Sequence, residues 1–330
     1  MLMPDFREAK RTLLLLPALG AFILLSLRAR EAAGAAAAGI RLCLNTVIPS
    51  LFPFLILSGL ILGVGIPERW LRLPGKVFER AFHIRSSALP ALLIGLLGGC
   101  PLGAEAAAEA YRRGCCSREE AGRLLIFSNN CSPGFLLGFV GTQVFGVREA
   151  ILLLALQWTV SLWLGFLLGV GKTASEAGTE TEERRRTSPA GIFASAVLGG
   201  ARSMLSICAY VVFFNVCSAF LPENALLRGL AELTGGLALC AGKGLPALAE
   251  AAFLVGWGGL SVAFQVYSAA EKAGLPTRLY LPLRLLHGAV MALCVLALRL
   301  GPVYAVGALV FAASSAFLVK SCRNKRPGRV

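Results

Sequence analysis

Long apolar runs without any charged residue dominate the chain, and short clusters of charged residues separate them. Eight such runs contain between 16 and 26 residues. The charged residues that bound them are Arg11 and Arg28, Arg41 and Glu68, Arg85 and Glu105, Arg123 and Arg148, Glu149 and Lys172, Arg202 and Glu223, Glu250 and Glu271, and Arg299 and Lys320. A helix needs about 20 mostly apolar residues to cross the hydrocarbon core of a bilayer. The pattern therefore predicts an all-α, polytopic membrane protein with about seven to nine membrane segments, including broken or re-entrant helices.

The composition supports the same class of protein. Of the 330 residues, 56% are hydrophobic and only 15% are charged, whereas soluble domains carry about 25% charged residues. The mean hydropathy is +0.72. We therefore expect a multi-pass integral protein of the cell membrane whose main surroundings are the lipid bilayer.

The formal net charge of +14 is explained better by membrane topology than by nucleic-acid binding. The basic residues gather at the ends of apolar runs and do not form one amphipathic face with interleaved aromatic residues. Cytoplasmic loops of membrane proteins are enriched in Lys and Arg. This rule predicts that residues 69–85, the linker 172–187 and the basic tail 320–329 face the cytoplasm, and no nucleic acid is expected as a partner.

Catalytic and metal-binding signatures are missing from the sequence. It has no H-E-x-x-H, G-x-S-x-G or P-loop motif, and its ten cysteines include no C-x-x-C pair. Most of the cysteines lie in apolar runs, where a free Cys behaves as a small hydrophobic residue. We therefore expect neither an enzyme nor a metal or cofactor site.

Two further features leave alternatives open. The apolar segment 12–27 follows three basic residues, so it is either a secretory signal or, as we favour, an uncleaved first helix. The pairs Gly134 with Gly138 and Gly165 with Gly169 allow close helix contact within the chain or in a homo-oligomer. Such spacing is common in membrane helices and leaves the oligomeric state undecided.

A weak internal repeat divides the chain. Shifting the sequence by 160 residues places Gly98 and Gly99 on Gly258 and Gly259, and Glu105 on Gln265. Internal repeats are typical of transporters, with the solute site near the midplane where the repeats meet. The predicted parts are an N-terminal membrane helix (1–31), a first repeat half (32–171), a charged cytoplasmic linker (172–187), a second repeat half (188–300), and a last membrane helix with the basic tail (301–330).

The apolar runs contain residues that break helices. Three glycines and a proline fall between Gly98 and Gly103, just before a run rich in alanine that favours a helix. A second break lies between Ser128 and Gly134, where Ser, Asn and Pro favour a helix start. The residues expected to form the breaks are Gly98, Gly99, Pro101, Gly103, Pro133, Gly134, Gly258 and Gly259.

Irregular backbone at membrane depth is tolerated only where protein buries it or a wet cavity solvates it. Restarted half-helices direct unpaired N–H groups and a positive dipole end at such a cavity, which suits an anionic or polar solute. The candidate binding residues are Ser128, Asn129, Asn130, Ser132, Glu105, Gln265, Arg284 and His287. The alternative places the 128–134 cluster in a surface loop that caps a helix, and Glu105, Arg284 and His287 at the membrane interface.

Several motifs resemble a known family. They are Pro49-Ser-Leu-Phe-Pro-Phe54, Gly99-Cys-Pro-Leu-Gly-Ala104, Glu119-Glu-Ala-x-Arg-Leu-Leu-x-Phe-Ser-Asn-Asn130, Gly258-Gly-Leu-Ser-Val262 and Arg284-Leu-Leu-His-Gly288. In this order, over residues 38–300, the chain resembles the YlbJ-type sporulation integral membrane proteins, also called SpoVV. That family is associated with the nucleoside-recognition Gate domain of nucleoside transporters.

The resemblance implies a role in endospore formation. It implies transport of dipicolinic acid across the outer forespore membrane, with a nucleoside-type transporter and a non-transporting scaffold or sensor in spore-envelope assembly as alternatives. The family motif usually reads Gly-Tyr-Pro-x-Gly-Ala-Lys, and here Cys100 replaces the Tyr and Glu105 the Lys. A Lys would suit a dianion, so Glu105 argues against direct contact with dipicolinate at that position.

Overall fold

The computed structural model describes residues 6–175 and 188–301, and within them all regular secondary structure is helical. Six helices are long and apolar enough to cross a membrane, or seven if one bent pair is counted as a span. This confirms the polytopic helical class, and the expected last span within 301–330 lies outside the described residues. The elements are α1 (Phe6–Leu27), α2 (Ala29–Leu42), the π-helix η1 (Cys43–Val47), α3 (Ile48–Val64), α4 (Glu68–Phe82), η2 (Ser86–Ala88), α5 (Leu89–Gly98), α6 (Leu102–Arg112), α7 (Arg118–Ser128), α8 (Pro133–Phe135), the π-helix η3 (Leu136–Val144), α9 (Val147–Gly169), α10 (Pro189–Ala219), α11 (Ala225–Ala231), α12 (Leu233–Ala238), α13 (Gly244–Trp257), α14 (Gly259–Lys272) and α15 (Tyr280–Leu300).

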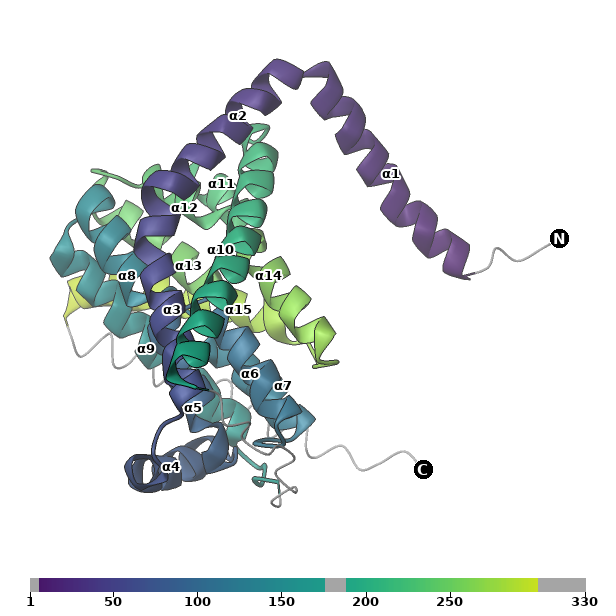
Figure 1. The fold of residues 1–330 in the computed structure, drawn as a ribbon. Coiled ribbons are helices and arrows are strands. Elements are labelled where there is room, and N and C mark those ends of the chain that lie inside the picture. The colour runs from purple at the N-terminus through teal and green to yellow at the C-terminus, as the bar shows by residue number, and fades with distance from the viewer. Residues whose placement is uncertain (1–5, 176–187, 302–330) are drawn as a thin grey trace, which may run out of the picture.

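Two long helices form what we call the wall of the molecule. One is the continuous rod α2–η1–α3, and the other is α10, which runs antiparallel beside it (Figure 1). Small residues let the two backbones approach. A Cβ on Gly59 would lie 3.2 Å from the Cα of Ala196, and one on Gly39 would lie 3.1 Å from the Cα of Val212.

The remaining helices, apart from α1 and α4, form a bundle against the wall. In its first half, α5 and α6 pack against each other as a hairpin whose tip is residues 99–101. The next span, α7 followed by α8 and η3, is interrupted at residues 129–132. The chain then returns through α9.

The second half of the bundle has the same order of elements. The short helices α11 and α12 pack as a second hairpin with Glu232 at its tip. The span α13–α14 is interrupted at Gly258, and α15 follows. The close pairing of α11 with α12 requires glycine, because a Cβ on Gly236 would clash with the Cα of Gly229.

The helices do not follow the 160-residue register that the sequence suggested. By element order, α7 corresponds to α13 and α9 to α15, so Arg118 matches Gly244 and Val147 matches Tyr280, at separations shorter than 160 residues. The shifted alignment instead matched the tip of one hairpin with the mid-span break of α13–α14. Our pairing of Gly98 and Gly99 with Gly258 and Gly259 was therefore wrong in architectural terms.

One end of the molecule, which we call the basic end, gathers the ends of several helices. The Arg123 guanidinium donates to the carbonyls of Phe82 at 3.0 Å and His83 at 2.6 Å, which ties the start of α7 to the end of α4. The Arg118 side chain donates to the Gly274 carbonyl at 2.6 Å, so the end of α14 lies here too. The first hairpin enters the bundle from this end, and the second enters from the opposite end, where α10 finishes.

Of the four glycines in the pairs that left the oligomeric state open, three contact neighbouring helices of the same chain, and Gly138 is exposed. A Cβ on Gly165 would lie 2.8 Å from the ring of Phe127, and one on Gly169 would lie 2.6 Å from the Phe82 carbonyl oxygen. A Cβ on Gly134 would lie 2.6 Å from the ring of Phe54. These three glycines therefore serve packing inside the chain.

Candidate functional site

A small pocket lies where the two hairpin tips and the two helix breaks meet, in the middle of the fold. It has a volume of about 60 Å³. Its lining residues are Val47, Leu51, Cys100, Asn129, Asn130, Cys131, Ser132, Phe135, Ile207, Val211, Glu232, Leu233, Thr234, Gly258, Ser261, Val262, Gln265 and Arg284. Both halves of the chain therefore contribute to one site.

The polar and apolar parts of the lining come from different bodies. The wall contributes only aliphatic side chains, namely Val47, Leu51, Ile207 and Val211. Every charged, amide and hydroxyl side chain of the lining belongs to the bundle. The bundle would thus make all the polar contacts with a bound solute, and the wall would offer it only an apolar surface.

The first break is held open by side chains that satisfy its backbone. The Gln157 amide on α9 accepts from the Cys131 N–H at 3.0 Å and donates to the Cys131 carbonyl at 2.9 Å. The Ser132 hydroxyl accepts from the Phe135 N–H at 3.1 Å and caps α8. Irregular backbone needs such partners inside a membrane, so this interruption is built into the sequence.

The first hairpin tip touches this break directly. The Cys100 N–H donates to the Asn130 carbonyl at 2.8 Å. Gly99 has φ +80°, and a Cβ there would lie 2.7 Å from the Ser132 nitrogen. A residue with a side chain would be strained at this φ and would push the tip away from the break, so glycine is required.

The second hairpin tip places a carboxylate at the pocket. Glu232 is 2% exposed, and its oxygens accept from the N–H groups of Thr234 at 3.0 Å and Gly235 at 2.6 Å. The carboxylate therefore caps α12, where the helix dipole favours negative charge. On α14, which follows the break at Gly258, the Gln265 amide donates to the Ser261 hydroxyl at 3.5 Å.

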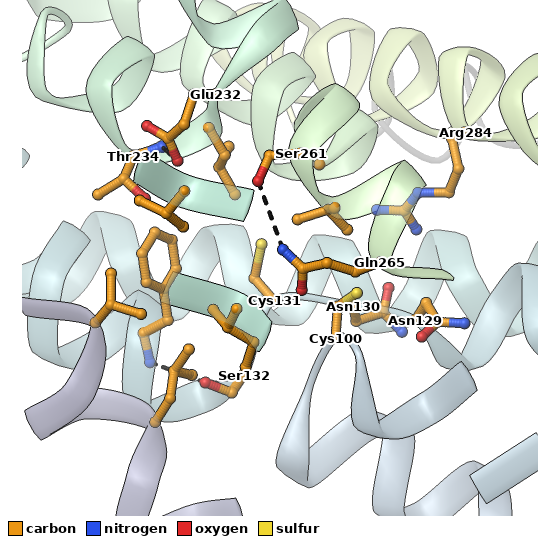
Figure 2. A pocket seen from close by; sticks show the side chains of 18 residues that line it. Cys100, Asn129, Asn130, Cys131, Ser132, Glu232, Thr234, Ser261, Gln265 and Arg284 are labelled. Atoms are coloured by element: carbon orange, nitrogen blue, oxygen red, sulfur yellow. Dashed lines mark hydrogen bonds between the residues drawn. The ribbon is translucent and has the colours of Figure 1, made fainter. Parts of the chain in front are cut away.

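Arg284 is the most unusual member of the lining. It is 2% exposed, and its Nη1 lies 2.9 Å from His287 Nδ1. Its contacts with the carbonyls of Trp257 and Val255 are longer, at 3.5 Å each. Within residues 6–175 and 188–301, no carboxylate forms an ion pair with it. Arg284 and Glu232 lie on opposite sides of the pocket, with Ser261 and Gln265 between them (Figure 2).

The structure brings five of the eight predicted binding residues into the lining, namely Asn129, Asn130, Ser132, Gln265 and Arg284. Ser128 and His287 lie behind it: the Ser128 hydroxyl donates to the Gly103 carbonyl at 3.3 Å, and His287 contacts Arg284. Of the predicted break residues, Gly98 ends α5, Pro101 precedes α6, and Gly258 separates α13 from α14. Gly103, Pro133, Gly134 and Gly259 instead lie within the first turns of α6, α8 and α14.

Glu105 lies in a separate groove of about 390 Å³ between α6, α10 and α14. The Ser203 hydroxyl on α10 donates to its carboxylate at 3.2 Å, so Glu105 joins the bundle to the wall. Glu109, farther along the groove, pairs with Arg112 at 2.6 Å. Gln265 lines both the groove and the pocket, so the two spaces lie on either side of this residue.

The sequence reading missed the second hairpin tip, with Glu232 and Thr234. A signal was present, because a single carboxylate stands between two glycine-containing apolar stretches and is followed two residues later by Thr. That arrangement is typical of a helix cap between two short helices.

Comparison with known proteins gives one informative match. The chain is 26% identical over 314 residues to the sporulation integral membrane protein YlbJ of Bacillus subtilis (strain 168), covering 79% of this chain and 76% of that protein. No protein-family model matches the chain, and no solved structure does. The match supports the resemblance to YlbJ-type proteins and, together with the apolar helices, a multi-pass membrane protein.

Proposed function

We propose that the chain is a membrane permease for a small anionic solute. The observation that carries this proposal is Arg284, a buried guanidinium that lines the pocket without a carboxylate partner in the described part of the chain. An unpaired charge in a low-dielectric interior is costly. A bound anion would compensate it, and the planar guanidinium suits a carboxylate.

The similarity to a sporulation protein directs the choice of solute. We propose a membrane role in sporulation and, following the family resemblance, dipicolinate as the solute that is carried across the outer forespore membrane. A nucleoside is the second candidate, because the resemblance extends to Gate-domain transporters and the amides of Asn129, Asn130 and Gln265 can recognise polar ring substituents. A scaffold or sensor in spore-envelope assembly is the rival without transport, although it has no need of an unpaired arginine beside a pocket.

The division between wall and bundle supports a mechanism of alternating access. Because the polar side chains that line the pocket all belong to the bundle, movement of the bundle along the aliphatic surface of the wall would carry the site with it. The hydrogen bond from Ser203 of the wall to Glu105 of the bundle would have to break in this movement. The two hairpins enter from opposite ends, as in inverted-repeat transporters. We propose that the groove beside Glu105 is the path from the basic end, because Gln265 lines both the groove and the pocket.

We propose that the basic end faces the cytoplasm, because of the basic residues that gather there. The helix α4, residues 112–123 and Lys172 after α9 bring many Arg and Lys side chains to the basic end, and such residues favour the cytoplasmic side. The stretch 69–85 and Lys172 then lie on the same side of the membrane, because the chain crosses once through α7–η3 and returns through α9. The tail 320–329, also expected there, lies outside the described residues.

Flux measurements in proteoliposomes test the proposal. Purified protein is reconstituted, and uptake of labelled dipicolinate and of labelled uridine is followed in parallel, with and without a pH gradient. We expect saturable dipicolinate uptake that unlabelled dipicolinate competes away. Saturable uridine uptake alone would favour the nucleoside assignment. Absence of both fluxes from correctly folded, inserted protein would refute the permease.

A further inference from the structure

The helix α4 has three distinct faces, and only one of them packs against the protein. The buried face consists of Gly75, Phe78 and Phe82, with Phe78 3% exposed. Phe82 stacks on Phe127 of α7, with ring centroids 5.2 Å apart. This face fixes α4 to the bundle at the basic end.

A second face is apolar and exposed. Trp70, Leu73 and Val77 are spaced by three and four residues and so form one stripe along the helix. Their exposed fractions are 65%, 74% and 62%. Large apolar side chains exposed together mark a surface that contacts lipid or another apolar partner.

A third face is basic. Arg69, Arg72, Lys76 and Arg80 are all exposed and are likewise spaced by three and four residues. In the described residues none of the four forms an ion pair. On a helical wheel this basic stripe directly adjoins the apolar one, so the two can meet a headgroup layer and the acyl chains beneath it at once.

The direction of α4 fits such a layer. The axis of α4 makes an angle of 106° with the hairpin helix α5. Figure 1 shows α4 lying across the lower end of α3, at the basic end of the molecule. A helix that lies across the ends of the spans is placed in the plane of the bilayer surface.

We propose that α4 is a binding surface for anionic phospholipid headgroups. The stripe of Trp70, Leu73 and Val77 inserts at the boundary between headgroups and acyl chains, and the four basic side chains bind lipid phosphates beside it. The basic stripe selects anionic lipid in preference to a second copy of this chain, because two copies would bring like charges together. This site is separate from the solute pocket and does not depend on the transport proposal.

Quenching of Trp70 fluorescence by brominated lipids tests the site in the full chain. The protein is reconstituted into mixed bilayers in which either phosphatidylglycerol or phosphatidylcholine carries bromine near the headgroup end of its acyl chains. Subtracting the signal of Trp70→Phe isolates Trp70 from the other tryptophans. One basic residue near an anionic surface corresponds to about a fivefold preference at low salt. We therefore expect quenching by brominated phosphatidylglycerol to show at least about fivefold enrichment of that lipid around Trp70.

Matched variants separate the α4 site from a general effect of charge. Replacement of Arg69, Arg72, Lys76 and Arg80 by Gln should abolish the enrichment while quenching by brominated phosphatidylcholine persists. The control replaces four exposed basic residues elsewhere, Arg30, Arg41, Arg148 and Lys243, by Gln, and should leave the enrichment in place. Equal quenching of the wild type by both lipids, absence of quenching by either, or equal loss in both quadruple variants would overturn the proposal.

Discussion

Replacement of Arg284 by Gln should weaken solute binding without harming the solute-free fold. The guanidinium is 2% exposed, makes one short contact, at 2.9 Å to His287, and has only 3.5 Å contacts to two carbonyls. Little native bonding is therefore lost in the Gln variant. The variant also no longer carries the cost of a buried charge without an anionic partner. We expect the apparent melting temperature of the solute-free protein to stay the same or to rise.

The loss in solute affinity follows from the interaction that disappears. Hydrogen bonds to a charged group contribute about 1.5–3 kcal/mol each, and 1.4 kcal/mol corresponds to a factor of ten in affinity. Loss of one such interaction with a carboxylate therefore predicts about 10- to 100-fold weaker binding. Arg284→Lys keeps the charge but loses the planar fork, so its affinity should fall between those of wild type and the Gln variant.

The assay combines ligand-dependent thermal stability in detergent with dipicolinate uptake in proteoliposomes. Arg278→Gln is the matched control, because Arg278 is exposed in the turn before α15, and we expect it to behave as wild type. Wild-type affinity in Arg284→Gln would refute the assignment of an anion to this pocket. A large fall in the melting temperature of the solute-free variant would show instead that the arginine mainly stabilises the fold.

Three further substitutions test the surroundings of the pocket. Asn129→Ala should weaken uridine binding about fivefold or more in a thermal-shift titration, because Asn129 lines the pocket and its buried Oδ1, which has no hydrogen-bond partner, can accept from an N–H or O–H of a nucleoside, and unchanged uridine binding would remove it from a nucleoside site. Glu105→Gln keeps an acceptor for Ser203 but cannot ionise, so any stimulation of uptake by a pH gradient should disappear in this variant. Ser203→Ala should retain the stimulation. If uptake by Glu105→Gln still responds to the pH gradient, the Glu105 carboxylate is not the group that couples proton movement to uptake. Gly99→Ala should lower the free energy of unfolding by about 2 kcal/mol or more, because φ is +80° and the added Cβ would lie 2.7 Å from a backbone nitrogen. Gly138→Ala, whose Cβ would have its nearest contact at 3.9 Å, should be nearly neutral in the same denaturation measurement, and equal effects of the two glycine changes would contradict the tip geometry.

The sequence predicted those parts of the site whose local chemistry is strong. Pro101 and the glycines around it disfavour a continuous helix, and the Ser and Asn cluster after Ser128 favours a helix start. The structure indeed interrupts its helices at residues 99–101, 129–132 and 258. The short helices α11 and α12 could not be predicted in the same way, because seven and six residues are too few to show a clear period, and their pairing depends on tertiary contacts between glycines.

The spacing of residues in the sequence could not show which of the candidate side chains line the pocket. Arg284 and His287 share a face at a spacing of three residues, yet only Arg284 lines the pocket, because the histidine lies behind it. Likewise Glu105 begins the helix that follows the hairpin tip, but it turns toward Ser203 of the wall and leaves the tip itself to Cys100. Residue types therefore indicated the chemistry of the region, while packing between helices decided which side chains face the solute.

The error in the repeat register came from matching glycines that occupy different places in the fold. Gly99 and its match Gly259 both have positive φ, at +80° and +85°, whereas Gly98 is the last residue of helix α5 and its match Gly258 has φ +88°. Yet Gly99 lies at the tip of a hairpin that enters from the basic end, and Gly258 interrupts a span that starts at the other end. A positive φ, which is accessible mainly to glycine, occurs where α5 and α13 stop, at Gly99 and Gly258, whereas α7 and α11 stop at Asn129 and Glu232 with negative φ. The order of hairpin, broken span and span, found once from each end, explains why four helix stops of different local conformation converge on one pocket beside Arg284.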